Sequence, residues 1–271
     1  MIKQAIIPLA GLGTRLLPLT SVFPKELLPI NGKPGLEYII QECFDAGIEE
    51  IIFIISKKKL TIKKYFFNDK FYKDLIKKKK DPRISKEYKK LIKYRKKIKF
   101  VYQNNPKGTG DAVLKTKKFI RNNFFLMLLP DDLIIKNNCS KSMIKVHNKY
   151  KSSVMASMSI KKENASRWGI YRLKKKLSKL DYLISDVIEK PSVKDAPSNK
   201  AVIGRYILPK SIFKKLSKLK PGKNGEIHIT DAIQLLINDK RKFVAHNFQG
   251  KYLDCGTISG YINSNIEINK I

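Results

Sequence analysis

The sequence predicts an α/β fold in which a central, mixed and mostly parallel sheet is flanked by helices. Short apolar runs at 4–9 and 51–55 have the composition of buried strands, and the segment 35–46 between them gathers its apolar residues on one helical face. Gly47 follows where that helix would end. This strand, helix, strand order favours parallel strands, whose ligands bind beyond the carboxyl ends of the strands.

The rest of the chain continues this pattern. Thr109 is expected to cap a helix that begins near Gly110. No repeat, linker or composition boundary divides the 271 residues, so they are predicted to form a single domain. A further helix is predicted at 230–238, and further strands are predicted at 98–103, 124–129, 153–160, 169–173, 183–188 and 201–208.

Residues 57–97 are the most cationic part of the chain and carry aromatic residues among the lysines. This pattern predicts a basic helical insertion, amphipathic in character, whose apolar side chains pack inward. Aromatic residues among lysines are also typical of surfaces on which nucleic-acid bases stack. A basic nucleic-acid-binding protein is therefore the alternative from another functional class.

The net charge of the chain is +34, from 57 Lys and Arg residues against 23 Asp and Glu residues. The excess is mostly lysine and accompanies abundant Ile, Asn, Phe and Tyr, all of which have AT-rich codons. A drift in base composition explains this pattern without a polyanionic partner, so no specific nucleic-acid partner is expected. The charge should still raise the local concentration of anionic substrates.

The cysteines and the amino terminus indicate the cellular compartment of the protein. Cys43, Cys139 and Cys255 are odd in number and widely spaced, which fits neither a disulfide framework nor a zinc site, and they are expected to be small buried residues. The first apolar run is interrupted by Pro8 and Gly11, so it predicts neither a secretory signal nor a membrane span. A cytoplasmic protein without a membrane partner is expected.

The segment that follows the first predicted strand has the chemistry of a phosphate-binding loop. It reads Pro-Leu-Ala-Gly-Leu-Gly-Thr-Arg, and its Ala10, Gly11 and Gly13 allow backbone N–H groups to turn toward an anion. Arg15 and Lys25 add two cations beside this turn. Backbone donors with an arginine and a lysine suit a nucleoside triphosphate, which binds through charge-assisted hydrogen bonds.

Ordered motifs extend this signal over nearly the whole chain. The chain resembles the sugar nucleotidyltransferases, and in particular the bacterial UTP:glucose-1-phosphate uridylyltransferases, also called UDP-glucose pyrophosphorylases. The Pro-Lys-Glu at 24–26 resembles the uridylyltransferases, whereas thymidylyl relatives usually carry Ser-Lys-Gln. The matching segments lie at 11–18, 23–34, 103 with 107–110, 129–132, 168–169, 187–191, 202–206, 225–233 and 253–256.

The resemblance implies a Rossmann-like nucleotidyltransferase fold, with residues 1–271 forming one catalytic domain. It implies transfer of a uridylyl group from UTP to α-D-glucose 1-phosphate, giving UDP-glucose and pyrophosphate by in-line attack on the α-phosphorus, without a covalent enzyme intermediate. A sister enzyme that uses dTTP or another sugar 1-phosphate is the nearest alternative. A homo-oligomer, either a dimer or a tetramer, is also expected.

Joining two anions requires positioning and a hard cation with oxygen ligands. Asp131 follows an apolar strand directly and suits such a role for Mg²⁺, which keeps several waters and takes phosphate oxygens as further ligands. By resemblance Asp254 completes the metal site, whereas Asp132 is expected to be a neighbour only. Arg15, Lys25 and Lys190 are the expected catalytic cations.

The sugar-binding residues are expected at the end of the strand predicted at 183–188. Successive residues of an extended chain face opposite sides, so Glu189 and Lys190 are placed to meet different parts of one ligand. By resemblance Glu189 accepts hydrogen bonds from glucose hydroxyls and Lys190 binds the sugar phosphate. Gly169 and Gly204 are expected to let the backbone approach the hexose.

The base-binding residues are predicted from chemistry together with the motif. Gln103 both donates and accepts, which suits the imide edge of uracil, and Glu26 is expected to accept from the uracil N–H. Gly108 is expected to leave room for the ring. Two positions depart from the family pattern: the chain has Thr109 where the family commonly carries leucine, and Asp111 where it commonly carries histidine. The acidic group in place of an imidazole is expected to alter base or ribose affinity.

Overall fold

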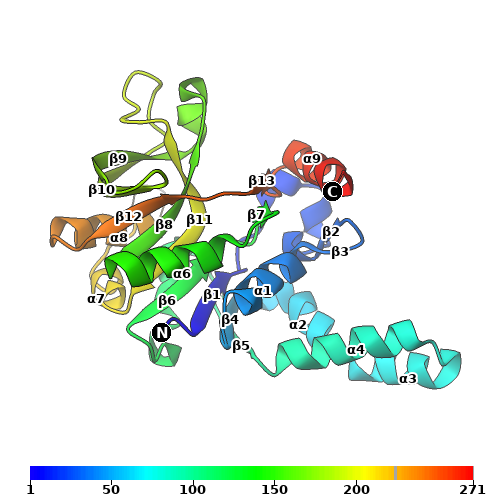
Figure 1. Ribbon diagram of the computed structural model, residues 1–271. Coiled ribbons are helices and arrows are strands. Elements are labelled where there is room, and N and C mark those ends of the chain that lie inside the picture. The colour runs from blue at the N-terminus through cyan, green and yellow to red at the C-terminus, as the bar shows by residue number, and fades with distance from the viewer. Residues whose placement is uncertain (223–224, 271) are drawn as a thin grey trace.

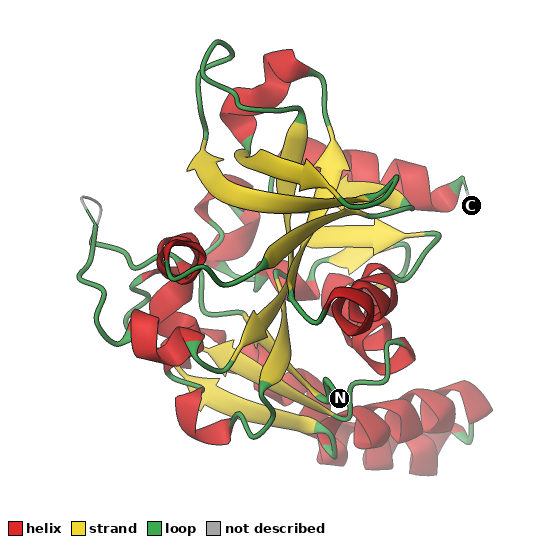
Figure 2. Ribbon diagram, turned by 60° about the vertical axis from the view of Figure 1, so that its left-hand side comes forward, coloured by secondary structure: helices red, strands yellow, loops and turns green. Residues whose placement is uncertain are grey.

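The computed structural model describes residues 1–222 and 225–270. Its centre is a nine-stranded sheet in the order β5-β4-β1-β6-β11-β8-β12-β10-β9, with helices on both faces (Figures 1 and 2). The strands are β1 (Gln4–Pro8), β4 (Glu50–Ile55), β5 (Ile98–Tyr102), β6 (Phe124–Leu128), β8 (Ser153–Ser159), β9 (Gly169–Lys176), β10 (Asp181–Glu189), β11 (Lys200–Pro209) and β12 (Phe243–Asn247).

The sheet is mixed, as the sequence predicts, and its strand directions divide it into two parts. Strands β5, β4, β1 and β6 are parallel neighbours, as are β8 and β12. Only β10 and β11 run against the other strands of this sheet, so most of its strands share one direction. The α/β class and its mostly parallel direction are confirmed.

Two small sheets lie outside the central one. Strand β2 (Pro29–Ile30) pairs with β3 (Lys33–Pro34), and β7 (Asp132–Ile135) pairs antiparallel with β13 (Lys251–Asp254). The register of the second pair sets Asp254 opposite Asp132. This pairing joins the end of β6 to a segment that lies more than a hundred residues later in the sequence.

Alternation along the inner strands distributes apolar side chains over both faces of the sheet. Ala5 and Ile7 of β1 belong to the cluster that α1 (Gly35–Asp45) and α6 (Cys139–Tyr150) cover, whereas Ile6 belongs to the opposite cluster. The opposite face is covered by α5 (Gly108–Leu114), α7 (Ile212–Leu216) and α8 (Ile229–Asn238). The last helix, α9 (Ile258–Asn269), packs on β13 and β2.

The basic segment is helical and extends from the end of the sheet at β5, as Figure 1 shows. Its helices are α2 (Leu60–Phe67), α3 (Asp69–Lys79) and α4 (Pro82–Arg95). Phe66 is buried and Tyr72 stacks on Tyr88 at 5.3 Å, in line with inward packing of the aromatic residues. Phe71 departs from that expectation, because it is 52% exposed. Within the described residues, no helix has the length and apolar character needed to cross a membrane.

Several elements differ from the sequence prediction. Strands β2, β3, β7, β12 and β13 and helices α6, α7 and α9 were not predicted, and α5 begins at Gly108 rather than near Gly110. Thr109 lies inside the first turn of α5 and is not its cap, since its hydroxyl accepts a hydrogen bond from the Ile229 N–H at 3.2 Å. The residue therefore ties α5 to α8. The three cysteines are buried free thiols, as expected.

A buried ion pair links α1, β11 and the end of β6. The Arg205 guanidinium is fully buried and binds both carboxylate oxygens of Glu42, at 2.8 to 3.1 Å. Its remaining donors reach the backbone oxygens of Leu129 at 3.1 Å and Asp132 at 2.6 Å. Every arm of the guanidinium is thus used, which is the condition under which a buried charge is tolerated.

Replacing Arg205 with Met should destabilise the protein by about 3–5 kcal/mol, because the Glu42 carboxylate would stay buried without its partner. Urea unfolding followed by circular dichroism measures this loss. The control is Lys3→Gln, which removes the exposed ion pair with Glu49 and should leave the unfolding midpoint nearly unchanged. A loss below about 1 kcal/mol for Arg205→Met would contradict the assigned role.

Candidate active site

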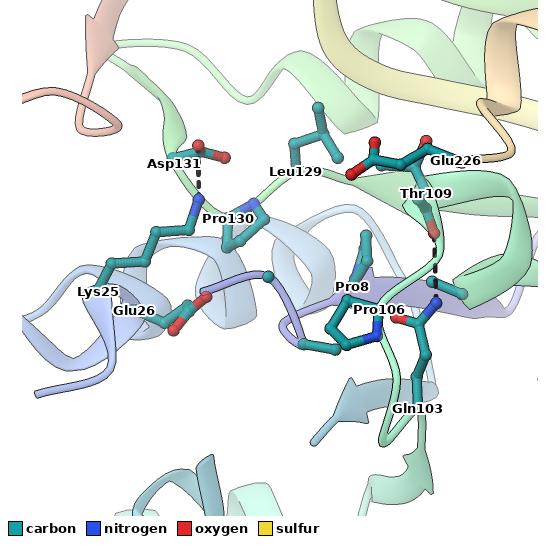
Figure 3. A pocket seen from close by; sticks show the side chains of 14 residues that line it. Pro8, Lys25, Glu26, Gln103, Pro106, Thr109, Leu129, Pro130, Asp131 and Glu226 are labelled. Atoms are coloured by element: carbon teal, nitrogen blue, oxygen red, sulfur yellow. Dashed lines mark hydrogen bonds and ion pairs between the residues drawn. The ribbon is translucent and has the colours of Figure 1, made fainter. Parts of the chain in front are cut away.

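The phosphate-binding loop predicted from the sequence lies at the carboxyl end of β1. Ala10 and Gly11 line a cavity together with Lys25, which lies on the 3₁₀ helix η3 (Lys25–Leu27) (Figure 3). Gly13 is not among the lining residues. It adopts a left-handed φ of 73° before the 3₁₀ helix η1 (Thr14–Leu16), and a Cβ there would lie 3.3 Å from Lys25 Cδ, so the turn itself requires glycine.

Two cavities meet at the end of β6, and Leu129 and Asp131 line both of them. The first, of about 260 Å³, is lined by Pro8, Ala10, Gly11, Lys25, Glu26, Gln103, Pro106, Gly108, Thr109, Ala112, Leu129, Pro130, Asp131 and Glu226. The second, of about 490 Å³, is lined by Arg15, Leu129, Asp131, Asp132, Ser166, Arg167, Trp168, Gly169, Glu189, Lys190, Val202, Gly204, Tyr206, Thr230, Tyr252, Asp254 and Thr257.

Asp131 is the charged residue at the junction of the two cavities. Its carboxylate lies 2.7 Å from Lys25 Nζ and 3.4 Å from Arg15 Nη2. Burial opposes ionisation, but the Lys25 ammonium outweighs it and holds the pKa of the Asp131 carboxyl below its usual range. The same contact raises the pKa of Lys25 against the effect of its own burial. Both groups are therefore charged at neutral pH.

The residues at this junction fit a divalent cation with oxygen ligands. A Cβ placed on Gly256 would lie 2.9 Å from Asp131 Oδ2 and 3.2 Å from Asp254 Oδ1, so the two carboxylates border the same small space. A hydrogen bond of 2.8 Å from the Cys255 N–H to the Asp131 carbonyl oxygen fixes the two segments together. Two carboxylates that line the same cavity suit Mg²⁺, which takes its other ligands from water and phosphate.

Asp132 lies beside this pair and turns away from it. Its carboxylate accepts hydrogen bonds from the Gly204 N–H at 2.9 Å and from the Tyr252 hydroxyl at 2.6 Å. Burial and the negative charge of Asp131 raise the pKa of the Asp132 carboxyl to about 6. With both oxygens already engaged, Asp132 is a structural neighbour of the carboxylate pair.

Glu189 and Lys190 both line the second cavity. Glu189 pairs with Gly169 across β9 and β10, and a Cβ on Gly169 would lie 3.0 Å from Glu189 Oε2. Lys190 has a left-handed φ of 46° and donates its N–H to the Trp168 carbonyl oxygen at 3.0 Å. Residues other than glycine rarely adopt such a conformation, so contacts such as this hydrogen bond must stabilise the backbone of Lys190. Trp168 forms part of the wall of this cavity.

Gly204 also lines the second cavity, but its own neighbours explain the glycine. A Cβ there would lie 2.4 Å from Asp132 Oδ2 and 2.6 Å from Leu129 Cβ. The sequence prediction that Gly204 lets the backbone approach the hexose stays a prediction, and close packing gives a second reason for the glycine. The residue must be glycine for β11 to lie against the segment that carries Asp131.

The other end of the first cavity contains Gln103 and Gly108. Gln103 is 3% exposed, and its amide nitrogen donates to Asp111 Oδ2 at 2.6 Å and to the Gly108 carbonyl oxygen at 3.3 Å. That Gly108 leaves room for a base stays a prediction, and the structure gives a further reason for the glycine. A Cβ at Gly108 would lie 2.5 Å from the Ile227 carbonyl oxygen, so the backbone of the segment before α8 occupies that space.

Glu26 lines the first cavity, where the sequence predicts that its carboxylate accepts a hydrogen bond from uracil. In the structure this carboxylate already has a partner. Both of its oxygens accept hydrogen bonds from Lys59 Nζ, at 2.8 and 2.9 Å. Nothing in the sequence indicates this pair, because Lys59 ends a run of three lysines, a pattern typical of solvated surface. Burial lowers the pKa of Lys59, and the Glu26 charge opposes that shift.

Other lining residues were not singled out as binding residues by the sequence reasoning. Glu226 lies inside the matching segment 225–233. Arg167, Tyr252 and Thr257 are each next to a matching segment, and this adjacency is the signal in the sequence that could have indicated them. Arg15, by contrast, was predicted, and its side chain is 65% exposed beside Asp131. Taken together, the junction offers cations and a carboxylate pair between two cavities. That arrangement suits a reaction between two anionic ligands.

Comparison with known proteins agrees with this geometry. The nucleotidyl transferase family model matches residues 4–271. A UTP–glucose-1-phosphate uridylyltransferase of Streptococcus pyogenes is 37% identical over 274 positions, which cover 98% of this chain and 88% of the relative.

Solved structures give the same result. A UDP-glucose pyrophosphorylase complexed with UDP-glucose has a TM-score of 0.86 at 37% identity, covering 100% of this chain and 99% of the other. A UTP-bound UGPase from Acinetobacter baumannii has a TM-score of 0.86 at 32% identity, covering 99% of this chain and 93% of the other. With a family match over almost its entire length, the chain belongs to the nucleotidyl transferase family.

Proposed function

We propose that the protein is a UTP:glucose-1-phosphate uridylyltransferase, which forms UDP-glucose and pyrophosphate from UTP and α-D-glucose 1-phosphate. The observation that carries the proposal is the position of Asp131, with Lys25 and Arg15, where the two cavities meet. The names of the similar proteins, uridylyltransferase and UDP-glucose pyrophosphorylase, support the same reaction. Each cavity takes one substrate, and the transfer occurs between them.

The first cavity is proposed to hold UTP. Backbone N–H groups of the loop through Ala10, Gly11 and Gly13 are proposed to face the phosphates, as the glycine-rich turn after β1 supports. Gln103 and Gly108 are proposed to contact the uracil ring at the far end of the cavity. Glu26 is proposed to act at this site as the anchor of Lys59, since its carboxylate is already engaged.

The second cavity is proposed to hold glucose 1-phosphate. Glu189 is proposed to accept hydrogen bonds from sugar hydroxyls, while Lys190 binds the phosphate. Gly169 and Gly204 lie at the wall of this cavity, where a larger residue would meet Glu189 or Asp132. The two glycines thus let the wall pack closely and leave the cavity open.

Asp131 and Asp254 are proposed to hold Mg²⁺, which would neutralise phosphate charge during the transfer. Lys190 is proposed to orient the sugar phosphate so that one of its oxygens attacks the α-phosphorus in line. The new P–O bond forms as the bond to pyrophosphate breaks, and Arg15 and Lys25 stabilise the charge on the departing group. The residues act by position and charge, so no covalent enzyme intermediate is needed.

Three further properties are part of the proposal. The chain is proposed to act as a single catalytic domain, which the continuous nine-stranded sheet supports. A cytoplasmic location is supported by its three free cysteines. A homo-oligomer is supported by a row of exposed isoleucines on the outer side of α9 at spacings of four, namely Ile258, Ile262 and Ile266.

Purified protein should release pyrophosphate from UTP only when glucose 1-phosphate and Mg²⁺ are both present. A coupled pyrophosphate assay with a panel of UTP, dTTP and CTP and of several sugar 1-phosphates measures this activity. Chelation of the metal with EDTA should stop turnover, and added Mg²⁺ should restore it. Absence of turnover by the folded protein would defeat the proposal, and a preference for dTTP or another sugar phosphate would favour the sister activity.

Replacing Asp131 with Asn should lower kcat about a hundredfold, or on the order of 3 kcal/mol, because the carboxylate that holds Lys25 and the metal loses its charge. Steady-state kinetics at saturating substrates measure the effect, and thermal unfolding checks that the variant is folded. The matched control is Asp239→Asn on the surface, which should keep the wild-type rate. An unchanged kcat in Asp131→Asn would remove this residue from the mechanism.

Replacing Ile262 with Glu should shift the protein toward the monomer, because a charge would interrupt the apolar row on α9. Sedimentation velocity measures the mass of both proteins at several concentrations. The control is Asn263→Glu on the same helix, which adds the same charge beside the row. A monomeric wild-type protein would contradict the proposed oligomer.

A further inference from the structure

The amide of Gln103 has a fixed orientation, and Asp111 fixes it. The amide nitrogen lies 2.6 Å from Asp111 Oδ2 and 3.3 Å from the Gly108 carbonyl oxygen. A carboxylate and a carbonyl oxygen only accept hydrogen bonds, so the group that faces them must be the NH₂ of the amide. The two acceptors therefore determine which end of the amide is the nitrogen.

The consequence is that Gln103 presents its carbonyl oxygen to the first cavity. Figure 3 shows the amide nitrogen of Gln103 at a dashed hydrogen bond, which is the one to the Gly108 carbonyl oxygen, and the amide oxygen on the side of Pro106. In the part of the chain that the structure describes, no donor forms a hydrogen bond with Gln103 Oε1. This oxygen is also not one of the buried side-chain atoms that lack a partner, so it is accessible from the surface. An acceptor thus faces the cavity from a residue that is itself 3% exposed.

A fixed acceptor distinguishes nucleobases by the group at the middle of their pairing edge. Uracil and thymine carry an N3–H there, which donates to a carbonyl oxygen, whereas the same atom of cytosine is itself an acceptor. Two acceptors facing each other in a buried place leave both without a partner, which is costly. A glutamine that turned freely would avoid this cost by flipping its amide and would bind either base.

The position of Asp111 makes the flip unfavourable. A flipped amide would direct its oxygen at the Asp111 carboxylate, replacing a charge-assisted hydrogen bond with a repulsive contact. Asp111 is itself held on α5, where Lys115 Nζ lies 3.6 Å from its other oxygen. It is absent from the lining of the first cavity, so it acts on a ligand only through Gln103.

We propose that Asp111 is a positioning residue for base selection, which locks the Gln103 amide so that the enzyme accepts the imide edge of uracil or thymine and rejects cytosine. The inference rests on the proposed nucleotide-transfer function, because it assigns the base to the Gln103 end of the first cavity. It gives a physical role to the aspartate that stands where the resembling family commonly has histidine. The lock does not distinguish UTP from dTTP, since both bases carry the same N3–H.

The test compares Asp111→Asn with the wild type, using UTP and CTP. Asparagine keeps the shape of aspartate but offers both a donor and an acceptor, so a flipped Gln103 amide is opposed only by the Gly108 carbonyl oxygen at 3.3 Å and becomes less costly. The ratio of kcat/KM for UTP to kcat/KM for CTP should fall at least about tenfold, with most of the change in KM and a gain for CTP. Asp74→Asn on α3 makes the same chemical change far from the cavity and should leave the ratio unchanged.

A purely structural role would lower kcat/KM for both nucleotides equally, and that outcome would overturn the inference. So would a wild-type enzyme that does not discriminate between UTP and CTP. Isothermal titration calorimetry of both nucleotides with Mg²⁺ separates this test from the proposed reaction. If the wild type binds UTP but transfers nothing, the proposed function fails, and the UTP to CTP affinity ratio of Asp111→Asn still decides the inference.

Discussion

The buried ion pair between Arg205 and Glu42 is the constraint on which the geometry of the junction depends. Arg205 comes from β11 and Glu42 from α1, and the guanidinium also holds the carbonyl oxygens of Leu129 and Asp132. These two carbonyl groups lie on either side of Asp131. Because a buried guanidinium without partners is costly, the segment is kept in one conformation, and the Asp131 carboxylate is positioned before any ligand arrives.

The charges around Asp131 follow from that fixed position. A strongly cationic chain concentrates carboxylates here, where Asp131, Asp132 and Asp254 lie on neighbouring segments. Lys25 and Arg15 balance Asp131, while Asp132 is satisfied by Tyr252 and the backbone. The cations are thus already in place where charge would develop on phosphate groups, and little rearrangement is required of them.

The two cavities draw on different parts of the sheet. The first is built at the carboxyl ends of the parallel strands β1 and β5, as expected for a ligand of an α/β sheet. The second includes residues of β9, β10 and β11, where the antiparallel neighbours lie. They meet at the end of β6, which borders both regions of the sheet. One sheet can therefore present two anions to each other across the Asp131 segment.

The sequence by itself determined the local features of the site. Apolar runs located the inner strands, the glycines after β1 indicated an anion-binding turn, and a carboxylate directly after a strand marked Asp131. The tertiary structure alone decided the pairings, such as Lys59 with Glu26, Asp111 with Gln103, and Asp254 of β13 beside Asp131. Periodicity and turn chemistry act over a few residues and can be read along the chain, whereas these contacts depend on strand register and helix packing. The close approach of Ile227 to Gly108 shows the same limit, because nothing near Gly108 in the sequence indicates which backbone will pass against it.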